Sequence, residues 1–277
     1  MSPKPRPVVL ITGASSGIGH ATALALAAQG WIVYGAARRV DRMQELEEAS
    51  GCHVIEMDVT DDASICAGVD RIIQEQRRLD VLVNNAGYGS HGALEDVPIN
   101  EARRQFEVNV FGLARLTQLV LPTMRALGRG RIINVSSIGG RIYEPIGSWY
   151  HATKFAVEGL SDSLRIELAP HGIDVVIIQP GPIRTEWNSI SRRSAKEYSG
   201  AGPYAEQARA LVRNYERVDD SPASGTPEDV AATIVRAATA RRPKTRYATP
   251  ASAKIVVAAR RLLPDRIMDL ILRRLAM

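Results

Sequence analysis

Short apolar runs rich in β-branched residues recur along the chain and are separated by longer amphipathic stretches. The runs show no polar alternation, which is typical of strands buried on both faces of a sheet. The strands predicted in this way are Val8–Thr12, Ile32–Ala36, His53–Met57, Val81–Asn84, Arg131–Val135, Asp174–Gln179 and, with a weaker pattern, Thr245–Ala248. The pattern therefore predicts a sheet of seven strands.

Helical patterns lie between these runs. The clearest are Gly17–Gln29, Ala63–Arg77, Glu101–Leu127 and Thr153–Ala169. Alternating strands and helices imply right-handed crossovers and a parallel sheet covered by helices on both faces. We therefore predict a doubly wound α/β fold. Its elements occupy most of the 277 residues, and no repeat or linker interrupts them, so residues 1–277 are predicted to form a single domain.

Two segments depart from this alternation. Thr185–Asp220 is long and polar and follows a strand, and we expect it to be a mobile lid over the substrate site. The segment Ser252–Met277 combines apolar residues with cations, and it is expected to form a C-terminal helical extension. Pro264 should divide this extension into two helices.

Composition narrows the class of protein. Lys plus Arg number 35 and Asp plus Glu number 30, which gives a net charge of only +5. Aromatic and basic residues are not interleaved, so nucleic-acid binding is not expected. Cys52 and Cys66 show neither a disulfide framework nor metal-ligand spacing, and no metal site is predicted.

The first residues and the hydropathy of the chain bear on its location. Residues 1–7 lack the apolar stretch of a secretory signal. No uncharged apolar run reaches the roughly 18 residues of a membrane-spanning helix. A cytoplasmic protein is the expectation.

Gly13, Gly17 and Gly19 directly follow the first predicted strand and precede a helix. Ligands of open parallel sheets bind beyond the carboxyl ends of the strands. Gly13 permits a tight turn, Gly17 allows close approach of a pyrophosphate, and Gly19 allows helix and strand to pack closely. The helix N-terminus offers free N–H groups to the phosphates. The order of strand, turn and helix favours a dinucleotide site over a glycine turn without a ligand.

Four ordered motifs resemble the short-chain dehydrogenase/reductase family, over roughly residues 7–250. They are Gly13-x3-Gly17-x-Gly19, Asn84-Asn85-Ala86-Gly87, Tyr150-x3-Lys154 and Pro180-Gly181. The resemblance implies a Rossmann fold, a nicotinamide cofactor and hydride transfer. It further implies cofactor contacts from Ser15, Ser16, Ile18, Val59, Asn85, Ala86, Gly87, Pro180 and Gly181. The asparagines of the second motif have an equally plausible role in holding the sheet together.

The end of the second strand bears on the choice of cofactor. In the family that these motifs resemble, members that use NAD carry Asp at the position of Ala37. Arg38 follows it in this chain. A guanidinium suits a phosphate through paired N–H donors. We predict NADP(H), with Arg38 as the main contact and Arg39 as a helper. The alternative is a solvated basic turn that faces Asp41 or Glu45.

Asp58 follows the third strand, and by resemblance it contacts the adenine amino group. Its alternative role is to cap the next helix, although Thr60 or Asp61 suits that position better.

Tyr150 and Lys154 lie one helical turn apart and share a helix face. An ammonium near the phenol, together with the positive charge of oxidised nicotinamide, favours phenolate and lowers the tyrosine pKa. Such tuning is what general acid–base catalysis requires. Ser137, at the carboxyl end of the fifth strand, faces the same crevice, whereas alternation turns Ser136 to the opposite face.

The resemblance adds Asn109 as a fourth catalytic residue, which interrupts its helix and holds a water beside Lys154. In this scheme Tyr150 exchanges a proton with the substrate oxygen and Ser137 hydrogen-bonds that oxygen. Lys154 tunes the tyrosine and holds the nicotinamide ribose. By contrast, His151 points away from Tyr150 on the helix, and we expect it to be a surface or packing residue.

Family likeness also suggests that the Ile183 backbone and the Thr185 hydroxyl bind the carboxamide of the cofactor. The alternative is that Pro180–Thr185 is simply a rigid turn that ends a strand.

Apolar side chains are expected to surround the substrate. Those of the lid are Trp187, Ile190, Tyr198, Tyr204, Leu211, Val212 and Tyr215, and those of the opposite wall are Ile138, Gly139, Ile142, Tyr143, Ile146 and Trp149. Each lid residue has packing under the segment as its alternative role. The pocket offers no cation poised for a carboxylate. A hydrophobic ketone, aldehyde or secondary alcohol, steroid-like or lipid-like, is the predicted substrate.

The sequence leaves more than one binding partner open. The 252–277 extension presents an apolar face flanked by arginines. It either docks on the domain or on another subunit, which is the favoured interpretation, or touches a membrane. The resemblance implies a homodimer or homotetramer. The alternative functions are an NADPH-sensing regulatory protein without turnover, and a dehydratase or epimerase on the same fold.

Overall fold

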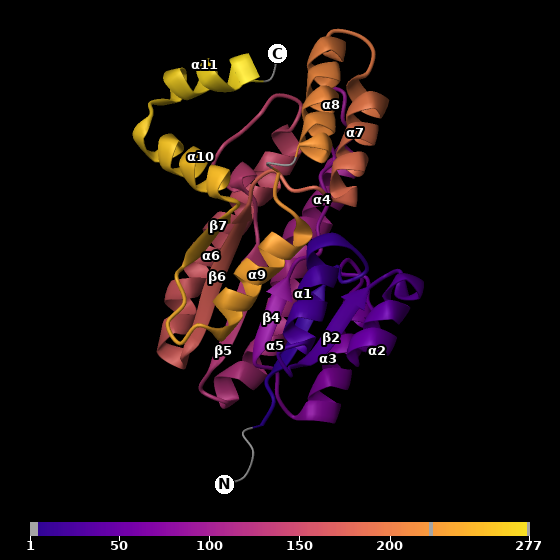
Figure 1. Ribbon diagram of the computed structural model, residues 1–277, viewed down its shortest axis with the longest axis vertical. Coiled ribbons are helices and arrows are strands. Elements are labelled where there is room, and N and C mark those ends of the chain that lie inside the picture. The colour runs from indigo at the N-terminus through magenta and orange to yellow at the C-terminus, as the bar shows by residue number, and fades with distance from the viewer. Residues whose placement is uncertain (1–4, 222–223, 276–277) are drawn as a thin grey trace.

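All seven strands lie parallel in one sheet, with the order β3-β2-β1-β4-β5-β6-β7, in the computed structural model, which describes residues 5–221 and 224–275 (Figure 1). The strands are β1 Val8–Thr12, β2 Ile32–Ala37, β3 His53–Glu56, β4 Val81–Asn84, β5 Gly130–Val135, β6 Ile173–Pro180 and β7 Arg246–Thr249. Each boundary lies within one residue of its prediction. The chain leaves β1 toward β2 on one side and later returns to place β4 on the other, so the sheet reverses its winding beside β1.

Helices cover both faces of the sheet. The α-helices are α1 Gly17–Ala27, α2 Gln44–Ser50, α3 Asp62–Gln76, α4 Ile99–Phe106, α5 Gly112–Ala126, α6 Ser148–Leu168, α7 Glu186–Ser199, α8 Ala205–Asp220, α9 Pro227–Thr239, α10 Ala251–Leu262 and α11 Asp265–Leu275. Short helical segments are η1 Val40–Met43, η2 Glu107–Phe111, η3 Ile138–Gly140 and η4 Ala169–His171. The doubly wound α/β fold is confirmed.

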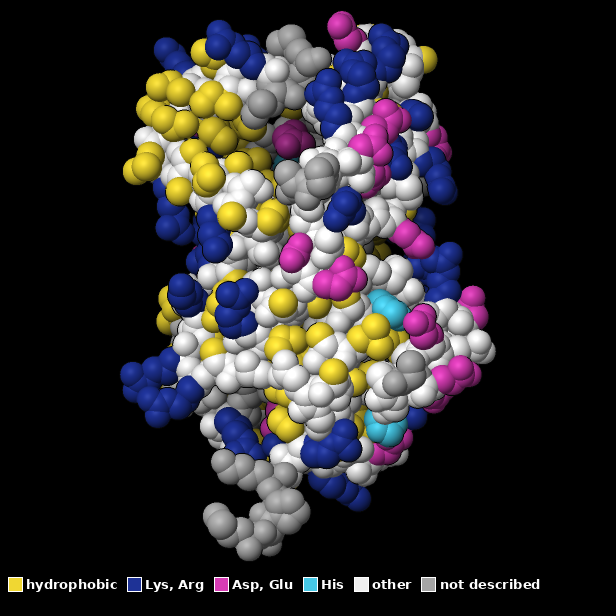
Figure 2. Space-filling model, in the orientation of Figure 1, with side chains coloured by type: hydrophobic (Ala, Val, Ile, Leu, Met, Phe, Trp, Pro, Cys, Tyr) yellow, Lys and Arg dark blue, Asp and Glu magenta, His cyan; other side chains and the backbone are white. Residues whose placement is uncertain are grey.

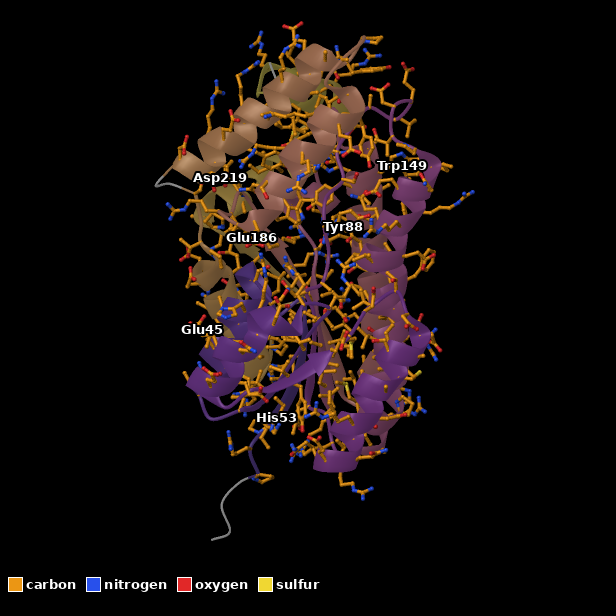
Figure 3. The ribbon with its side chains drawn as sticks, turned by 90° about the vertical axis from the view of Figure 1, so that its right-hand side faces the viewer. Glu45, His53, Tyr88, Trp149, Glu186 and Asp219 are labelled. Atoms are coloured by element: carbon orange, nitrogen blue, oxygen red, sulfur yellow. The ribbon has the colours of Figure 1, made fainter. Side chains whose placement is uncertain are left out.

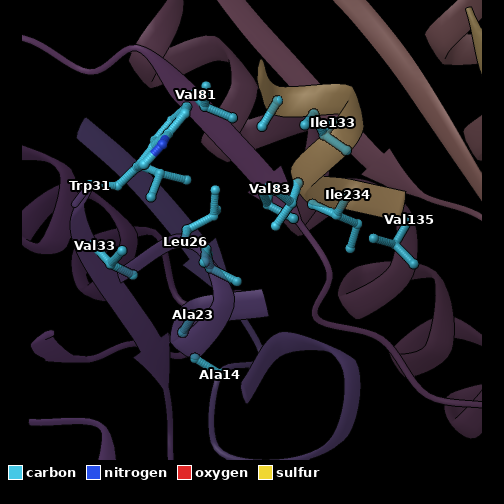
Figure 4. Packing of buried hydrophobic residues seen from close by; sticks show 14 of the residues in the cluster. Ala14, Ala23, Leu26, Trp31, Val33, Val81, Val83, Ile133, Val135 and Ile234 are labelled. Atoms are coloured by element: carbon cyan, nitrogen blue, oxygen red, sulfur yellow. The ribbon is translucent and has the colours of Figure 1, made fainter. Parts of the chain in front are cut away.

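Alternation along the strands divides the core into two layers. In β1, Val9 and Ile11 pack under α1 and α9, whereas Val8 and Leu10 pack under α3 and α5. Figure 4 shows the first layer, where Leu26 of α1 meets side chains of the sheet and Ile234 of α9 lies close by. Because both faces are buried, the strands appear in the sequence as unbroken apolar runs, which is why the pattern located them so closely.

The predicted helix Glu101–Leu127 is interrupted. Its residues form α4, a π-helical turn (η2) and α5. Periodicity does not reveal a single π turn, because the apolar spacing resumes after it. The helix predicted from Thr153 begins earlier, at Ser148, so Tyr150 lies in its first turn.

The segment Thr185–Asp220, expected to be a mobile lid, is largely helical. This segment forms a helical hairpin of α7 and α8, which stands above the sheet (Figure 1). The inner face of α7 carries Ser191, Ala195 and Ser199, all fully buried. Small polar residues at helical spacing produce no hydrophobic pattern, so the sequence indicated a polar loop.

The C-terminal extension forms α10 and α11, and Pro264 lies between them as predicted. Met268 and Leu272 of α11 pack against Ile142. Residues 276 and 277 of the predicted extension lie outside the described residues. None of the helices in residues 5–221 and 224–275 is both long and apolar enough to cross a bilayer.

Candidate functional site

The glycine turn lies between β1 and α1 with the conformation that the motif requires. Gly13 and Gly17 have φ angles of +69° and +54°, which L side chains rarely adopt. A Cβ on Gly19 would lie 2.3 Å from the carbonyl oxygen of Gly13. The Asn85 side chain donates to the Thr12 carbonyl at 2.9 Å, so the second motif holds the turn in place.

This turn fits a dinucleotide pyrophosphate. Ser16 occupies the N-cap position of α1, yet its side chain makes no capping hydrogen bond to the first turn. The leading N–H groups of α1 are therefore not satisfied by that side chain, and they point at the space beside Gly17. The methyl carbon of Thr185 lies 3.6 Å from where a Cβ on Gly17 would be, so any larger side chain there would narrow this space.

Replacing Gly19 with Ala should destabilise the fold, because the new methyl group would clash with the Gly13 backbone at 2.3 Å and with the Asn85 side chain at 2.6 Å. We expect a loss of about 3 kcal/mol in the free energy of unfolding, measured by urea denaturation. Gly159→Ala in α6 is the matched control, since a Cβ there meets nothing within 4 Å. That change should be neutral or stabilising. Equal stability of the two variants would contradict the close packing of the turn.

Three polar groups gather at the adenosine end of the crevice. Arg39 donates to the Ser15 hydroxyl at 3.3 Å and lies 3.8 Å from Glu186 at the start of α7. Arg38 lies 4.0 Å from the Asp58 carboxylate, and its side chain is mostly exposed. Arg38 therefore faces neither of the acids named in the alternative interpretation of a basic turn. The two guanidinium groups and the serine hydroxyl together form a cationic corner.

Asp58 does not cap the following helix. Its Oδ1 accepts from the N–H and hydroxyl of Thr60, at 2.9 and 2.8 Å. Asp61 caps α3 by accepting from the N–H of Ala63. The expectation that another residue fits the cap better is confirmed, and Asp58 remains at the edge of the crevice.

Tyr150, Ser137 and Lys154 meet at the carboxyl edge of the sheet. The Ser137 hydroxyl accepts from the N–H of Gly139 at 2.9 Å, and it also acts on the Tyr150 phenol, whose pKa it lowers. Lys154 donates to the Val135 carbonyl at 3.0 Å, and its Nζ lies 6.0 Å from the centre of the Tyr150 ring. Tyr150 and Lys154 are both buried. A Cβ on Gly87, in the second motif, would lie 3.8 Å from that Nζ, which joins these groups to the glycine turn.

Helix α6 is held firmly against the sheet. Glu158, one turn beyond Lys154, accepts from Gln179 of β6 at 2.8 Å and from Arg246 of β7 at 2.9 Å. Arg246 also donates to Asp162 at 2.6 Å. This buried network fixes the register of α6 on two strands, and thereby the position of Tyr150 and Lys154. Ser136 faces Glu158 rather than the crevice, as alternation predicts.

The pKa of Tyr150 differs from the expectation. Burial raises the pKa of Tyr150 to about 12, and the hydrogen bond with Ser137 opposes this only in part. Burial also lowers the pKa of Lys154 to about 8. In the chain by itself, the cost of burying a phenolate exceeds the attraction of an ammonium 6.0 Å from the ring. The predicted lowering by Lys154 is therefore not achieved by the protein groups alone.

Asn109 lies in the π turn η2 and is buried. Its Oδ1 accepts from the N–H of Tyr88 at 3.0 Å, and its Nδ2 donates to the Tyr88 carbonyl and to the Thr153 hydroxyl. The expected interruption of the helix is thus present. A Cβ on Gly87 would lie 3.1 Å from the Asn109 Oδ1, which puts Asn109 on the same side of Gly87 as Lys154.

The turn after β6 reaches the crevice from the opposite side. Ile183 pairs with Gly225 in an isolated parallel bridge, and Thr185 begins α7 without a side-chain capping bond. Gly181 packs against Ala253 of α10, since its Cβ would lie 3.0 Å from that side chain. Ile183 and Thr185 lie beside the glycine turn. Pro180 and Gly181 lie at the end of β6 and support the segment that carries Ile183 and Thr185.

An aromatic group that includes His91 surrounds Tyr150. The His91 ring centre lies 5.4 Å from that of Tyr150, 5.7 Å from Trp187 and 5.8 Å from Tyr215. Trp187 also lies 5.2 Å from Tyr150. His91 is buried, and its Nδ1 has no hydrogen-bond partner within the described residues.

The sequence pattern did not single out His91, so this placement was missed. The signal was its position just beyond the Asn84–Gly87 turn, which leads into the crevice. His151, by contrast, is a packing residue as expected. Its Nδ1 lies 2.9 Å from the Gly139 carbonyl, and its Nε2 accepts from the N–H of Glu144. Among the described residues, no three His, Cys, Asp or Glu side chains gather into a metal site.

Burial of His91 should make the protein sensitive to acid. Burial, reinforced by the nearby His151, lowers the pKa of His91 from 6.5 to about 3. The pKa of His91 is lower in the folded state than in the unfolded state. Its contribution to the free energy of unfolding is therefore fully present above pH 6.5 and is lost as the pH falls toward 3. Relative to His91→Phe, the wild type should lose about 2 to 3 kcal/mol between roughly pH 7 and pH 4.5. Parallel unfolding curves for both proteins across this range would contradict a buried neutral imidazole.

The residues expected around the substrate divide into two groups. Trp187 faces the Tyr150 ring, and Tyr215 packs edge-on against Trp187 and His91. Leu211 and Val212 instead form the core of the α7–α8 hairpin, with Tyr204 packed against them. On the opposite wall, Ile138, Ile142 and Tyr143 support α11, Ile146 joins the hairpin core, and Trp149 packs edge-on against Phe106.

Figure 3 shows the position of this site relative to the sheet. Tyr88 and Glu186 lie above the strands, at the end opposite His53, which opens β3. Arg42 donates to both carboxylate oxygens of Glu186 at 3.0 Å, which ties the hairpin to the end of β2. The glycine turn, α6 and the hairpin therefore meet at the carboxyl edge of the sheet.

Comparison with known proteins agrees with these observations. Residues 7–196 match the family model for short chain dehydrogenases. The chain is 37% identical to the "3-ketodihydrosphingosine reductase" of Bacteroides thetaiotaomicron, over 96% of each protein. It is 36% identical to the "NADPH-dependent 3-dehydrocapnine reductase" of Ornithobacterium rhinotracheale, over 94% of each. A crystal structure of a short-chain dehydrogenase from Streptomyces avermitilis superposes with a TM-score of 0.80 at 36% identity, covering 93% of this chain and 92% of that one. The chain belongs to the short-chain dehydrogenase/reductase family, whose members are oxidoreductases that use NAD(P) cofactors.

Proposed function

We propose that this oxidoreductase is an NADPH-dependent carbonyl reductase that acts on a long-chain, lipid-like ketone. The observation that carries the proposal is a buried phenol, Tyr150, whose pKa is influenced by Ser137 and whose ring lies 6.0 Å from the Lys154 Nζ, beside the glycine turn. Because the pKa of Tyr150 is raised to about 12, the phenol holds its proton near neutral pH. A protonated phenol is suited to donate to a carbonyl, which favours the direction of reduction.

Each polar group then has one role. Bound NADPH supplies the hydride that the carbonyl carbon receives. Tyr150 donates its proton to the carbonyl oxygen, and the Ser137 hydroxyl donates a hydrogen bond to the same oxygen as negative charge develops on it. Lys154 stabilises the phenolate that remains and holds the ribose hydroxyls. Asn109 holds the water through which the phenolate regains a proton.

The remaining predicted contacts hold the cofactor. The turn from Gly13 to Gly19, with Ser15, Ser16 and Ile18, binds the pyrophosphate. Asp58 and Val59 contact the adenine, and Asn85, Ala86 and Gly87 lie beneath the ribose. On the far side Ile183 and Thr185 bind the carboxamide, while Pro180 and Gly181 shape their turn. The support for these roles is the arrangement around the crevice and the order of the family motifs.

The cationic corner supports NADPH over NADH. Arg38 and Arg39 bring two guanidinium groups to the end of β2, where Ala37 leaves no carboxylate to repel a phosphate. Ser15 adds a hydroxyl at the same place. A 2′-phosphate would accept paired N–H donors from Arg38 and displace the contact between Arg39 and Glu186. The relative from Ornithobacterium rhinotracheale is named as NADPH-dependent.

The pocket supports a substrate that is largely apolar and has a polar group near its carbonyl. Trp187 presents its ring beside Tyr150, and Tyr215 packs edge-on against Trp187, so these aromatic surfaces suit an alkyl chain. His91 offers a neutral imidazole with one donor and one acceptor, which matches a hydroxyl or amine close to the reacting carbon. The relative from Bacteroides thetaiotaomicron is named for reduction of a keto lipid base.

A panel of ketones tests this proposal directly. Chain length should be varied at a fixed head, and each length should be offered with and without a hydroxyl beside the carbonyl. NADPH absorbance should fall only with ketone present, and kcat/KM should rise with chain length. Tight NADPH binding without consumption for every ketone would contradict the reductase and favour a regulatory binding protein.

We also propose a homodimer or homotetramer built on α5 and α6. The supporting observation is the exposure of Phe111 and Phe155 on that face, since large apolar side chains in solvent often mark subunit contacts. The cytoplasmic location stays a prediction.

A further inference from the structure

The two C-terminal helices carry an apolar stripe that does not face the rest of the protein. On α10, the side chains of Ile255 and Leu262 are 72% and 82% exposed. On α11, Ile267, Leu270 and Ile271 are also exposed. The opposite faces of both helices are occupied already, because Val257 and Leu272 are buried against the domain. Figure 2 shows hydrophobic side chains gathered over α10 and α11, with Lys and Arg side chains beside them.

The exposed charges around this stripe are mostly positive. Lys254, Arg261, Arg266, Arg273 and Arg274 are exposed, and within residues 224–275 no carboxylate lies at ion-pair distance from them. Both acidic residues of the two helices have other partners. Asp265 pairs with Arg260 at 2.8 Å, and Asp269 accepts from the Tyr143 hydroxyl at 2.8 Å. The stripe is thus bordered by cations that have no counterpart among these residues.

We propose that α10 and α11 form a docking face for the surface of an anionic lipid bilayer. Apolar side chains bordered by Lys and Arg are the pattern of helices that lie in a membrane interface, where the side chains enter the acyl boundary and the cations meet the headgroups. A second copy of this chain is a poorer occupant. A two-fold contact would place this cationic border against itself.

The docking face adjoins the wall of the candidate site. Ala253 of α10 packs against Gly181, in the turn after β6. Met268 and Leu272 of α11 pack on Ile142, in the segment that joins Ser137 to Tyr150. A bound bilayer would therefore lie on the outer side of the two helices that support this wall. If the proposed function holds, docking brings the enzyme to the surface in which a lipid-like ketone is dissolved.

Vesicle sedimentation with the full-length chain tests the proposal without using activity. The probes are extruded vesicles of phosphatidylcholine alone, and of phosphatidylcholine mixed equally with phosphatidylglycerol. The chain should sediment with the anionic vesicles, only weakly with the neutral ones, and less at high salt. Replacing Arg261 and Arg266 with Gln should lower the partition coefficient roughly fivefold for each cation.

Neutral substitutions isolate the apolar contribution. The double variant Ile255→Gln with Leu262→Gln should lower the partition coefficient about tenfold or more. Ile99→Gln at the start of α4 is the matched control, because Ile99 is exposed on another surface, and it should bind as the wild type does. Thermal unfolding checks that each variant is folded.

Three outcomes would overturn the proposal. The chain would fail to sediment with anionic vesicles, or the double variant would bind as tightly as the wild type. In the third, the wild-type chain would bind no vesicles and the double variant would have a lower oligomer mass by light scattering, which would make this face an interface between copies. None of these depends on whether the chain reduces a ketone, so this proposal and the proposed function fail separately.

Discussion

Tyr150→Phe is expected to lower kcat/KM for ketone reduction by about a thousandfold, which is within the range that a positioned general acid contributes. The substitution removes only the hydroxyl. The ring would keep its contacts with Trp187 at 5.2 Å and with His91 at 5.4 Å between centres. Steady-state kinetics at saturating NADPH would measure the loss.

The binding of NADPH controls for damage to the site. Its dissociation constant, measured by fluorescence titration, should change little in Tyr150→Phe, because the glycine turn and the cationic corner are untouched. Ser137→Ala should show a smaller loss, about a hundredfold, since the serine stabilises charge but transfers no proton in this scheme. If Tyr150→Phe kept activity within tenfold of the wild type, another group would have to supply the proton.

Arg38→Asp is expected to lower the ratio of kcat/KM with NADPH to that with NADH by about a hundredfold or more. The change removes a guanidinium partner of the 2′-phosphate and adds a carboxylate that repels it. That carboxylate can also accept from the ribose 2′-hydroxyl of NADH. The ratio should be measured with one ketone under constant salt, because exposed charges are screened.

Arg42→Asp is the matched control for this change. Arg42 is a neighbouring, half-exposed arginine that contacts Glu186 at 3.0 Å, and Glu186 in turn lies 3.8 Å from Arg39. Its substitution should loosen the hairpin and alter rates with both cofactors alike, so the ratio should stay close to that of the wild type. An equal shift in ratio for both variants would mean that general positive charge, and no specific contact, selects NADPH.

Buried strands were the most predictable part of the fold. Val8–Thr12 and its counterparts are apolar on both faces, and a short unbroken apolar run of β-branched residues is typical of a strand covered on both sides. The glycine turn was equally predictable, because positive φ at Gly13 and Gly17 and the close approach at Gly19 admit no other residue. These are positions where local geometry restricts the residue type.

The parts that were missed depend on long-range packing. The α7–α8 hairpin buries serines such as Ser191 and Ser199, which a hydrophobic pattern cannot detect. His91 gains its place beside Tyr150 only when the hairpin brings Trp187 and Tyr215 across the crevice. The raised pKa of Tyr150 follows from burial by the same elements. Burial is a property of the assembled fold. The spacing within α6 therefore indicated that Lys154 lies near Tyr150, but not that burial would outweigh the ammonium in setting the tyrosine pKa.

Transfer of an isotopic label tests the central claim most directly. NADPH carrying deuterium at its reactive carbon should be mixed with the enzyme and a long-chain ketone, and the product analysed by mass spectrometry and NMR. The account predicts a secondary alcohol with deuterium at the former carbonyl carbon from the wild type, and almost none from Tyr150→Phe in the same time. Recovery of unchanged ketone with labelled NADPH still bound to the wild-type protein would contradict it.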